Sequence, residues 1–116
     1  MKHGVQGRTL GRAKAHREAM LANLATSLIL HETVVTTPGK AKETRRFVEP
    51  LITTAKQPSL ARRRQLAGRL PEDGAVRKLF EVLGPKYADR PGGYVRLTKL
   101  GPRPGDGAER VRMELV

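Results

Sequence analysis

Hydrophobic residues recur at three- and four-residue steps along several stretches of the chain, and the first such stretch covers residues 15–32. Its apolar positions are Met20, Leu21, Leu24 and Leu28, with Ala25 at the edge and His31 near the end. At about 3.6 residues per turn these positions share one face, so the pattern predicts a helix that buries this face in the core. For His31 we expect a packed, hydrogen-bonded ring rather than a ligand or a catalytic base.

A second helix is predicted to start at Thr37 as N-cap with Pro38 in the first turn, because the missing N–H of proline is no loss there. Its inner stripe consists of Ala41, Thr44, Val48, Leu51, Ile52 and Ala55. Pro50 falls inside this helix, where proline removes one backbone hydrogen bond. We therefore expect a kink near residues 46–49, or a break and restart of the helix there.

Capping and turn residues indicate the bounds of two further helices. Ser59 is a candidate N-cap for a helix over residues 60–70, and Asp73 is a candidate N-cap for a short fourth helix. Gly84 followed by Pro85 predicts the end of the fourth helix. The expected inward positions are Leu60, Leu66, Ala67 and Leu70 in the third helix, and Val76, Leu79, Phe80 and Leu83 in the fourth.

Three stretches have the residues or the alternation of β-strands. Residues 33–37 are β-branched throughout, residues 94–100 alternate in part, and residues 110–115 alternate cleanly. In the last stretch the expected core-facing side chains are Val111, Met113 and Leu115, with the charges toward water. Turn-forming residues 101–107 join the last two strands, which we expect to pair as a hairpin. The order of elements predicts an α+β fold with a small three-stranded sheet packed against about four helices.

The first seventeen residues contain no acidic residue, and three glycines are spaced among them. Their few apolar residues show no period, and glycine raises the entropy cost of ordering a segment. We therefore expect two parts: an extended basic arm, residues 1–14, that becomes ordered only on an anionic partner, and a single compact domain, residues 15–116. The alternative for the arm is an ordinary frayed terminus.

The charge balance then indicates the partner. The chain has 23 Lys and Arg residues against 11 Asp and Glu residues, a net charge of +12 and a pI of about 11.1, so nucleic acid is the default partner. A membrane surface ranks lower, because the first helix lacks a lysine-rich face and its uncharged run is too short to span a bilayer. Two Tyr, two Phe and no Trp are too few for base stacking, which favours structured RNA or a duplex held by its backbone.

Basic residues gather in the arm, in residues 40–46 and in residues 62–69. Arginine holds phosphate bidentately, and the helix start near residues 36–40 offers backbone N–H groups to a phosphate. For any single group, a solvated helix face is the alternative. Tyr87 and Tyr94 either contact RNA or close the sheet against the last helix. No catalytic triad and no acidic metal-binding cluster is recognisable, so we expect no enzyme activity, cofactor, metal or small-molecule substrate.

The chain resembles a known family along nearly its whole length. The matching residues include Gly7-Arg8, His16-Arg17, Thr36-Thr37, the run from Lys40 to Glu43 and, most specifically, the block from Gly84 to Arg96. The family is the bacterial large-subunit ribosomal protein seventeen. The resemblance implies a non-catalytic protein of the cytoplasmic ribosome that contacts large-subunit ribosomal RNA and neighbouring subunit proteins, near the exit region of the nascent chain. It also implies that the three-stranded sheet is mixed.

Candidate RNA contacts follow from the resemblance and from the basic groups. By position, the resemblance assigns RNA contact to Lys2, His3, Arg8, Arg12, His16, Arg17, Thr36, Thr37, Lys40 and Lys42. The basic groups add Lys14, Arg45, Arg62, Arg63, Lys86, Arg90 and Arg96. Two rival interpretations remain open: a regulatory or chaperone-like protein that binds any duplex nucleic acid, and a basic nuclease.

Overall fold

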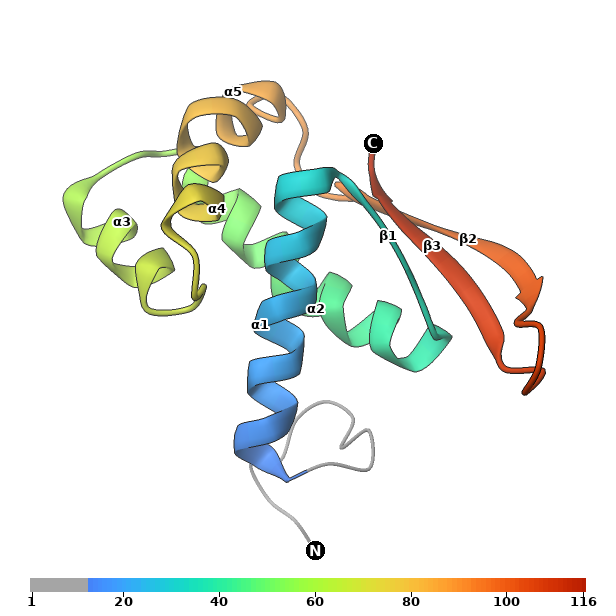
Figure 1. Cartoon of the computed structure of the whole chain (residues 1–116). Coiled ribbons are helices and arrows are strands. Elements are labelled where there is room, and N and C mark those ends of the chain that lie inside the picture. The colour runs from blue at the N-terminus through green and yellow to red at the C-terminus, as the bar shows by residue number, and fades with distance from the viewer. Residues whose placement is uncertain (1–12) are drawn as a thin grey trace, which may run out of the picture.

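The computed structural model describes residues 13–116 (Figure 1). The predictions that concern residues 1–12, including contacts by Lys2, His3, Arg8 and Arg12, lie outside the described residues. The elements are α1 Lys14–His31, β1 Thr33–Thr36, α2 Pro38–Ala55, α3 Leu60–Ala67, α4 Asp73–Lys78, the π-helical segment η1 Leu79–Leu83, α5 Gly84–Lys86, β2 Val95–Pro102 and β3 Glu109–Leu115. The predicted α+β class and order of elements are confirmed.

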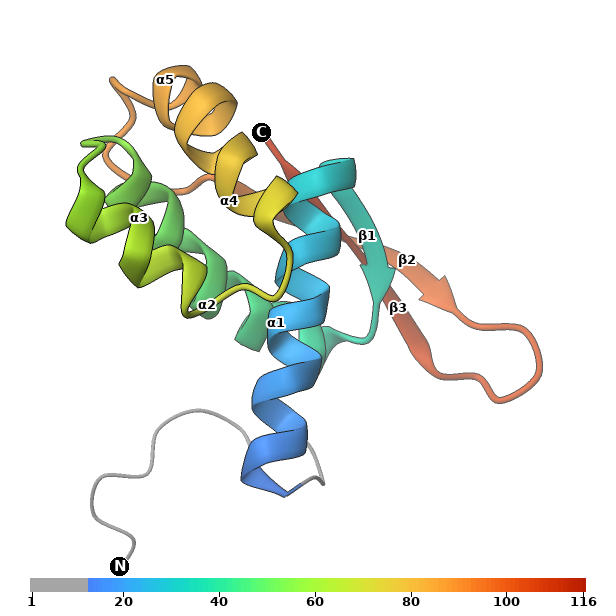
Figure 2. The ribbon, with the colours of Figure 1, turned by 60° about the vertical axis from the view of Figure 1, so that its left-hand side comes forward.

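The three strands form one antiparallel sheet in which β3 lies between β1 and β2. The predicted hairpin of β2 and β3 is confirmed, but the parallel pairing that a mixed sheet requires does not occur among residues 13–116. The reason is that β3 returns directly from β2 and takes the place between the other strands, so β1 and β2 never become neighbours. The helices lie on one side of the sheet (Figure 2).

α1 packs against α2, α4, β1 and β3, and these contacts place its buried face differently from the predicted one. Its buried apolar residues are Leu21, Ala25, Leu28 and Ile29. Met20 and Leu24, predicted for the same face, are half-buried, because Ala25 and Ile29 occupy the centre of the contact. His31 is exposed instead of packed, since the helix ends at this residue and the chain turns into β1.

α2 runs unbroken through Pro50, so of the two outcomes predicted there, a kink or a break, the break is wrong. All six predicted inner positions of this helix are buried. Pro50 itself is exposed on the outer side, and the Thr54 hydroxyl donates to its carbonyl at 2.9 Å. Burial of the whole stripe therefore offsets the local cost of an interior proline, which is about 3 kcal/mol.

The cap predicted for α3 is confirmed, because Ser59 Oγ accepts a hydrogen bond from the Arg62 backbone N–H at 3.1 Å. The helix ends at Ala67 instead of residue 70, with Gly68 as its C-cap. Leu66 and Leu70 are buried as predicted, whereas Ala67 is exposed and Leu60 is 66% exposed. The first turn of α3 therefore extends beyond the core.

α4, η1 and α5 form one continuous helical stretch, and two of its predicted bounds are wrong. Asp73 is the first helical residue instead of the N-cap, and the helix continues through Gly84 and Pro85. The π-helical segment explains the continuation: the Gly84 N–H bonds to the Leu79 carbonyl, and Pro85 then stands in the first turn of α5, where its missing N–H costs little. The four predicted inward positions of this stretch are all buried.

Tyr87 and Tyr94 close the sheet against the helices, and of the two alternatives for these residues this is the one observed. Both are buried, and their ring centroids lie 5.0 Å apart. The Tyr94 hydroxyl lies 3.1 Å from Thr53 Oγ1 on α2. Glu49 Oε2, also on α2, accepts hydrogen bonds from the backbone N–H groups of Tyr94 at 2.8 Å and Val95 at 3.4 Å. The start of β2 is therefore attached to α2 through the side chain of the preceding Tyr94 and through the backbone N–H groups of Tyr94 and Val95.

Candidate nucleic-acid interface

The N-terminal ends of α1 and α2 lack side-chain caps. Ala13, the N-cap residue of α1, has no side-chain oxygen, and Thr37 occupies the predicted N-cap position of α2 without accepting a hydrogen bond from the helix. Neither helix has an acidic residue in its first turn. By contrast, Ser59 caps α3 and Asp73 stands in the first turn of α4. Since a helix N-terminus carries partial positive charge and open N–H groups, α1 and α2 begin with two sites suited to anions.

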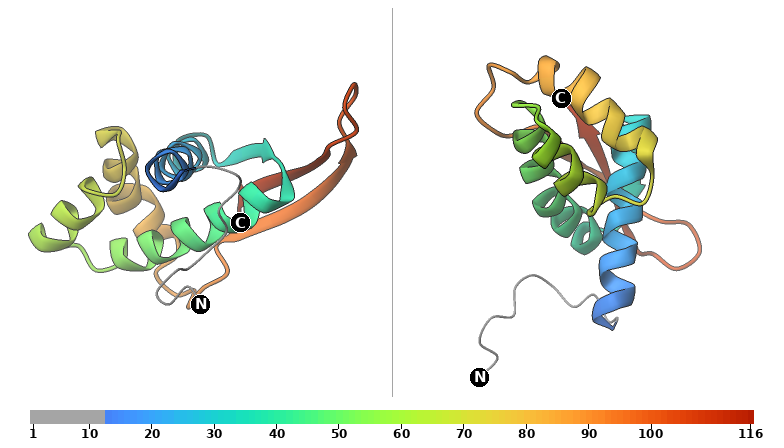
Figure 3. Two further views of the ribbon diagram at one scale, coloured as in Figure 1. Left: turned by 90° about the horizontal axis from the view of Figure 1, so that it is seen from below. Right: turned by 90° about the vertical axis from the view of Figure 1, so that its left-hand side faces the viewer.

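Basic residues stand in the first turns of both helices. α1 and α2 cross, and in Figure 1 the first turn of α1 lies at the bottom, while the first turn of α2 lies higher up at the right, beside the end of β1. The left panel of Figure 3 views the molecule from below. α1 has no buried residue before Leu21, so its first turns extend beyond the body. We define the basic end as Lys14, His16, Arg17, Thr36, Thr37, Lys40, Lys42 and Arg45. Within residues 13–116, none of its lysines or arginines forms an ion pair with an acidic side chain.

The predicted contacts on α3 lie away from the basic end and already interact with groups of the protein. Arg62 donates a hydrogen bond from its guanidinium to the Gln57 carbonyl at 2.8 Å. The Arg63 guanidinium lies 4.7 Å from the centroid of the Phe80 ring, in a cation–π contact with the fourth helical stretch. These contacts hold both side chains close to the surface of the protein.

Arg90 and Arg96 also donate hydrogen bonds to groups of the protein. Arg90 donates to the Gly93 carbonyl at 3.3 Å. Arg96, on β2, donates from Nε and Nη2 to Glu114 Oε1 on β3 at 3.2 and 2.9 Å. The fold therefore does not bring these residues together with the basic end, and much of the Arg96 charge is balanced within the sheet.

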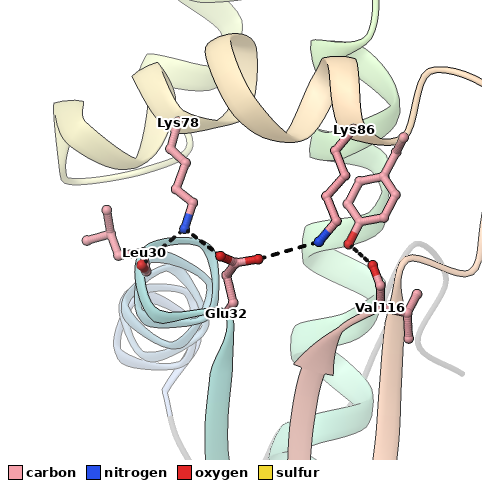
Figure 4. A network of polar contacts seen from close by, with 6 residues as sticks. Leu30, Glu32, Lys78, Lys86 and Val116 are labelled. Carbon is pink, nitrogen blue, oxygen red and sulfur yellow. Dashed lines mark hydrogen bonds and ion pairs between the residues drawn. The ribbon is translucent and has the colours of Figure 1, made fainter.

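Lys86, another predicted contact, belongs to a polar network around the end of α1 (Figure 4). Glu32 has a φ of 64°, the left-handed conformation that ends the helix, and its N–H bonds to the Leu28 carbonyl. Lys78 Nζ donates to the Leu30 carbonyl at 3.2 Å and to Glu32 Oε2 at 3.3 Å, and Lys86 Nζ lies 3.5 Å from Glu32 Oε1. The hydrogen bond from Lys78 and the charges of both lysines lower the pKa of the Glu32 carboxyl.

Replacing Glu32 with glutamine should reduce stability in a pH-dependent way. A carboxyl whose pKa is lowered by folding contributes stability that is fully present above its unfolded-state pKa, about 4.3 for Glu, and is lost as the pH falls through the folded-state value. Because the Glu32 side chain is 45% exposed, we expect a loss of only about 0.5–1 kcal/mol at pH 7.

Urea unfolding of the E32Q variant at pH 7 and pH 3 tests this expectation. The difference from the parent chain should shrink toward zero at pH 3. E81Q is the control, since it removes the same charge from an exposed position of η1. A deficit of E32Q that is the same at both pH values would show that the ion pairs do not contribute.

Two arginines of β3, Arg110 and Arg112, were not among the predicted contacts. Their alternation with Val111 and Met113 correctly predicted that they point away from the core. The sequence did not predict that they stand on the central strand, because that position depends on the pairing of β1 with β3. The alternating charges of this strand were the available signal.

A small-molecule site is not supported by the part of the chain that the structure describes. An open hollow of about 550 Å³ is lined by Arg46, Glu49, Pro50, Thr53, Thr54, Gly92 and Tyr94. Its main polar groups are engaged already, since Glu49 accepts from the backbone of β2 and Arg46 pairs with Glu43 at 3.3 Å. Within residues 13–116, no three His, Cys, Asp or Glu side chains gather as metal ligands, and no helix has the length and apolar character needed to cross a bilayer.

Comparison with known proteins gives the family directly. The family model for ribosomal protein L17 matches residues 20–116. The chain belongs to the ribosomal protein L17 family. Among the relatives, the large ribosomal subunit protein bL17 of Carboxydothermus hydrogenoformans is 54% identical over 107 residues, which cover 92% of this chain and 96% of the relative. The resemblance found in the sequence is thus confirmed, and the protein is a structural constituent of the bacterial large ribosomal subunit that serves translation on the ribosome.

Proposed function

We propose that the protein binds large-subunit ribosomal RNA through the basic end, and that the basic arm, residues 1–14, extends the same contact. The observation that carries this proposal is the combination of two uncapped helix ends with surrounding cations that have no acidic partner in residues 13–116. Phosphate oxygens can accept hydrogen bonds from the open N–H groups and from the basic side chains at the same time. Such contacts fix the position of the protein on the RNA without reading base sequence.

The remaining predicted contacts have a secondary part in this proposal. In the arm they are Lys2, His3, Arg8 and Arg12, and in the body Arg62, Arg63, Lys86, Arg90 and Arg96. The body residues already contact groups of the protein, so they would offer RNA only the N–H donors that these contacts leave unused. A guanidinium has five N–H donors in all. We therefore rank them below the basic end.

The proposed surroundings follow from the family. Neighbouring large-subunit proteins would be the protein partners, and the site on the subunit would lie near the exit region of the nascent chain. The role would be structural and without catalytic turnover. The membership of the L17 family supports these points, since the relative is itself a large-subunit protein.

Neutralising the start of α2 tests the proposal. A triple variant, K40Q/K42Q/R45Q, keeps side chains that suit a helix and removes three positive charges from the basic end. Binding to purified large-subunit RNA is measured over a series of salt concentrations. We expect the slope of log K against log salt to become shallower by about 2.7, since each lost phosphate contact contributes about 0.9.

The matched control is R64Q/R77Q/R103Q, which removes the same charge from α3, α4 and the hairpin turn. Two of these arginines pair with acidic side chains, Arg77 with Asp73 and Arg103 with Asp106. The control should change the slope by less than one contact. Equal losses in both variants would mean that net charge alone drives binding, and equal binding of unrelated duplex RNA would favour the regulatory interpretation.

A further inference from the structure

The sheet has one face that none of the helices in the described part of the chain covers (Figure 2). The pairing register shows which side chains lie on each face: Val34, Met113 and Leu97 are partners across the three strands and pack against the core. Because side chains alternate along a strand, the flanking positions point to the other side. We define the open sheet face as Thr33 and Val35 of β1, Arg96 and Thr98 of β2, and Arg110, Arg112 and Glu114 of β3.

The charges of the open sheet face are not balanced. Glu114 is its one acidic residue, and this carboxylate accepts both hydrogen bonds from Arg96. Arg110 and Arg112 have no acidic partner within the described residues, and Arg110 makes a long hydrogen bond, 3.5 Å, to the Gly101 carbonyl. Both arginines stand on the central strand two residues apart, which places their backbones about 7 Å apart on a support that is hydrogen-bonded on both sides.

The side chains beside these arginines suit a polar partner. Thr98 and Val35 are the cross-strand partners of Arg112, and both are exposed. Val35, 54% exposed, is the single large exposed apolar side chain of this face, which is too little for an apolar docking surface. Arg110 and Arg112 lie on the same face of β3, and Thr98 lies beside Arg112 on β2. This arrangement matches neighbouring phosphates of a nucleic-acid backbone, because each guanidinium can hold a phosphate bidentately.

We infer that the open sheet face binds the backbone of a second RNA segment, distinct from the segment at the basic end. This inference rests on the proposed function, since it takes ribosomal RNA as the partner. The first turns of α1 and α2 belong to the helical side of the sheet, and Arg110 and Arg112 point from the opposite side. The protein thus joins two RNA segments across its sheet, and its body fixes their separation.

The test is hydroxyl-radical footprinting of purified large-subunit RNA with the full chain and with R110Q/R112Q. We expect R110Q/R112Q to lose protection of one RNA segment and to keep the segment whose protection depends on Lys40, Lys42 and Arg45. The salt slope should become shallower by about 1.8, and the Kd near 0.1 M salt should rise by up to about 60-fold. R64Q/R77Q, which removes the same charge from α3 and α4, is the control and should keep the full footprint.

A second variant distinguishes a loss of RNA binding from a folding defect. T98E places a carboxylate directly across from Arg112, where a cross-strand ion pair favours the sheet while it opposes phosphate binding. It should lose the same RNA segment as R110Q/R112Q and should melt at or above the temperature of the parent chain.

The outcomes separate this inference from the proposed function. An unchanged footprint of R110Q/R112Q, with loss of protection in K40Q/K42Q/R45Q, overturns the inference and leaves the proposed function standing. Loss of a segment in R110Q/R112Q, with no change in K40Q/K42Q/R45Q, supports the sheet contact and contradicts the proposed function. An unchanged footprint combined with poor incorporation into subunits would mean that a neighbouring protein occupies this face, which also overturns the inference.

Discussion

Replacing Gly84 with alanine is expected to lower the free energy of unfolding by about 2–3 kcal/mol. Gly84 lies where η1 passes into α5, against the last turn of α2. A Cβ at this position would lie 2.6 Å from the Ala55 carbonyl oxygen and 3.2 Å from the Leu79 carbonyl oxygen. Both neighbours are backbone atoms and cannot rotate away, so α2 and the π-helical segment would have to separate. The buried residues that they share would then lose contact.

Urea unfolding of G84A, followed by circular dichroism, measures this loss. The matched control is G68A at the C-cap of α3, where the nearest atoms to an added Cβ are 3.5 and 3.7 Å away and the backbone is in the right-handed region. That substitution should leave stability unchanged or raise it by up to about 1 kcal/mol, since alanine restricts the unfolded chain. If G84A were as stable as the parent chain, the close approach of η1 to α2 would be wrong.

Deleting residues 1–12 is expected to weaken binding to large-subunit RNA by roughly 500-fold at 0.1 M salt, because three phosphate contacts each contribute about 0.9 to the salt slope. The three cations removed are Lys2, Arg8 and Arg12. The effect should fall on binding more than on folding, since the first buried residue of the described chain is Leu21.

Fluorescence titration of labelled RNA over a salt series measures the effect of the deletion, and thermal melts check that the shortened chain folds. The shortened chain should also show a salt slope that is shallower by about 2.7. Parent-level affinity with an unchanged slope would remove the arm from the RNA interface and leave the basic end to act alone.

Local patterns predicted those parts of the fold that depend on local chemistry. All predicted inner positions of α2 are buried, and the predicted Ser59 cap makes its hydrogen bond. The alternation in β3 identified Val111 and Met113 as core residues. In each case the period of one element matches a single buried face, so no information from distant residues was needed.

The failures share a different cause, which is competition from distant contacts. α1 is covered from several sides, so no single stripe describes its burial, and Pro50 is tolerated because the opposite side of α2 is fully packed. The helix continues past Gly84 because a π-helical turn moves Pro85 into a first-turn position. The place of β3 in the middle of the sheet was likewise set by long-range pairing.

The candidate nucleic-acid interface also depends both on local patterns and on distant contacts. Charge runs in the sequence locate groups of basic residues, but they do not show which of these cations contact other groups of the protein. Lys86 pairs with Glu32 from a distant part of the chain, and Arg63 lies on the Phe80 ring. Arg112, by contrast, lies outside the three basic groups found in the sequence and has no acidic partner among the described residues. Tertiary contacts therefore decide how much of each charge is available to RNA.

Incorporation into ribosomes in cells tests most directly whether the arm and the basic end attach the protein to large-subunit RNA. Three tagged chains are compared: the full chain, a chain that lacks residues 1–12 and carries K40Q/K42Q/R45Q, and the R64Q/R77Q/R103Q control. Each is expressed beside the untagged protein, and lysates are separated on sucrose gradients after a moderate-salt wash. We predict that the full chain and the control sediment with the large subunit, while the shortened triple variant stays at the top of the gradient. Sedimentation of that variant with the large subunit, at the level of the full chain, would contradict the account.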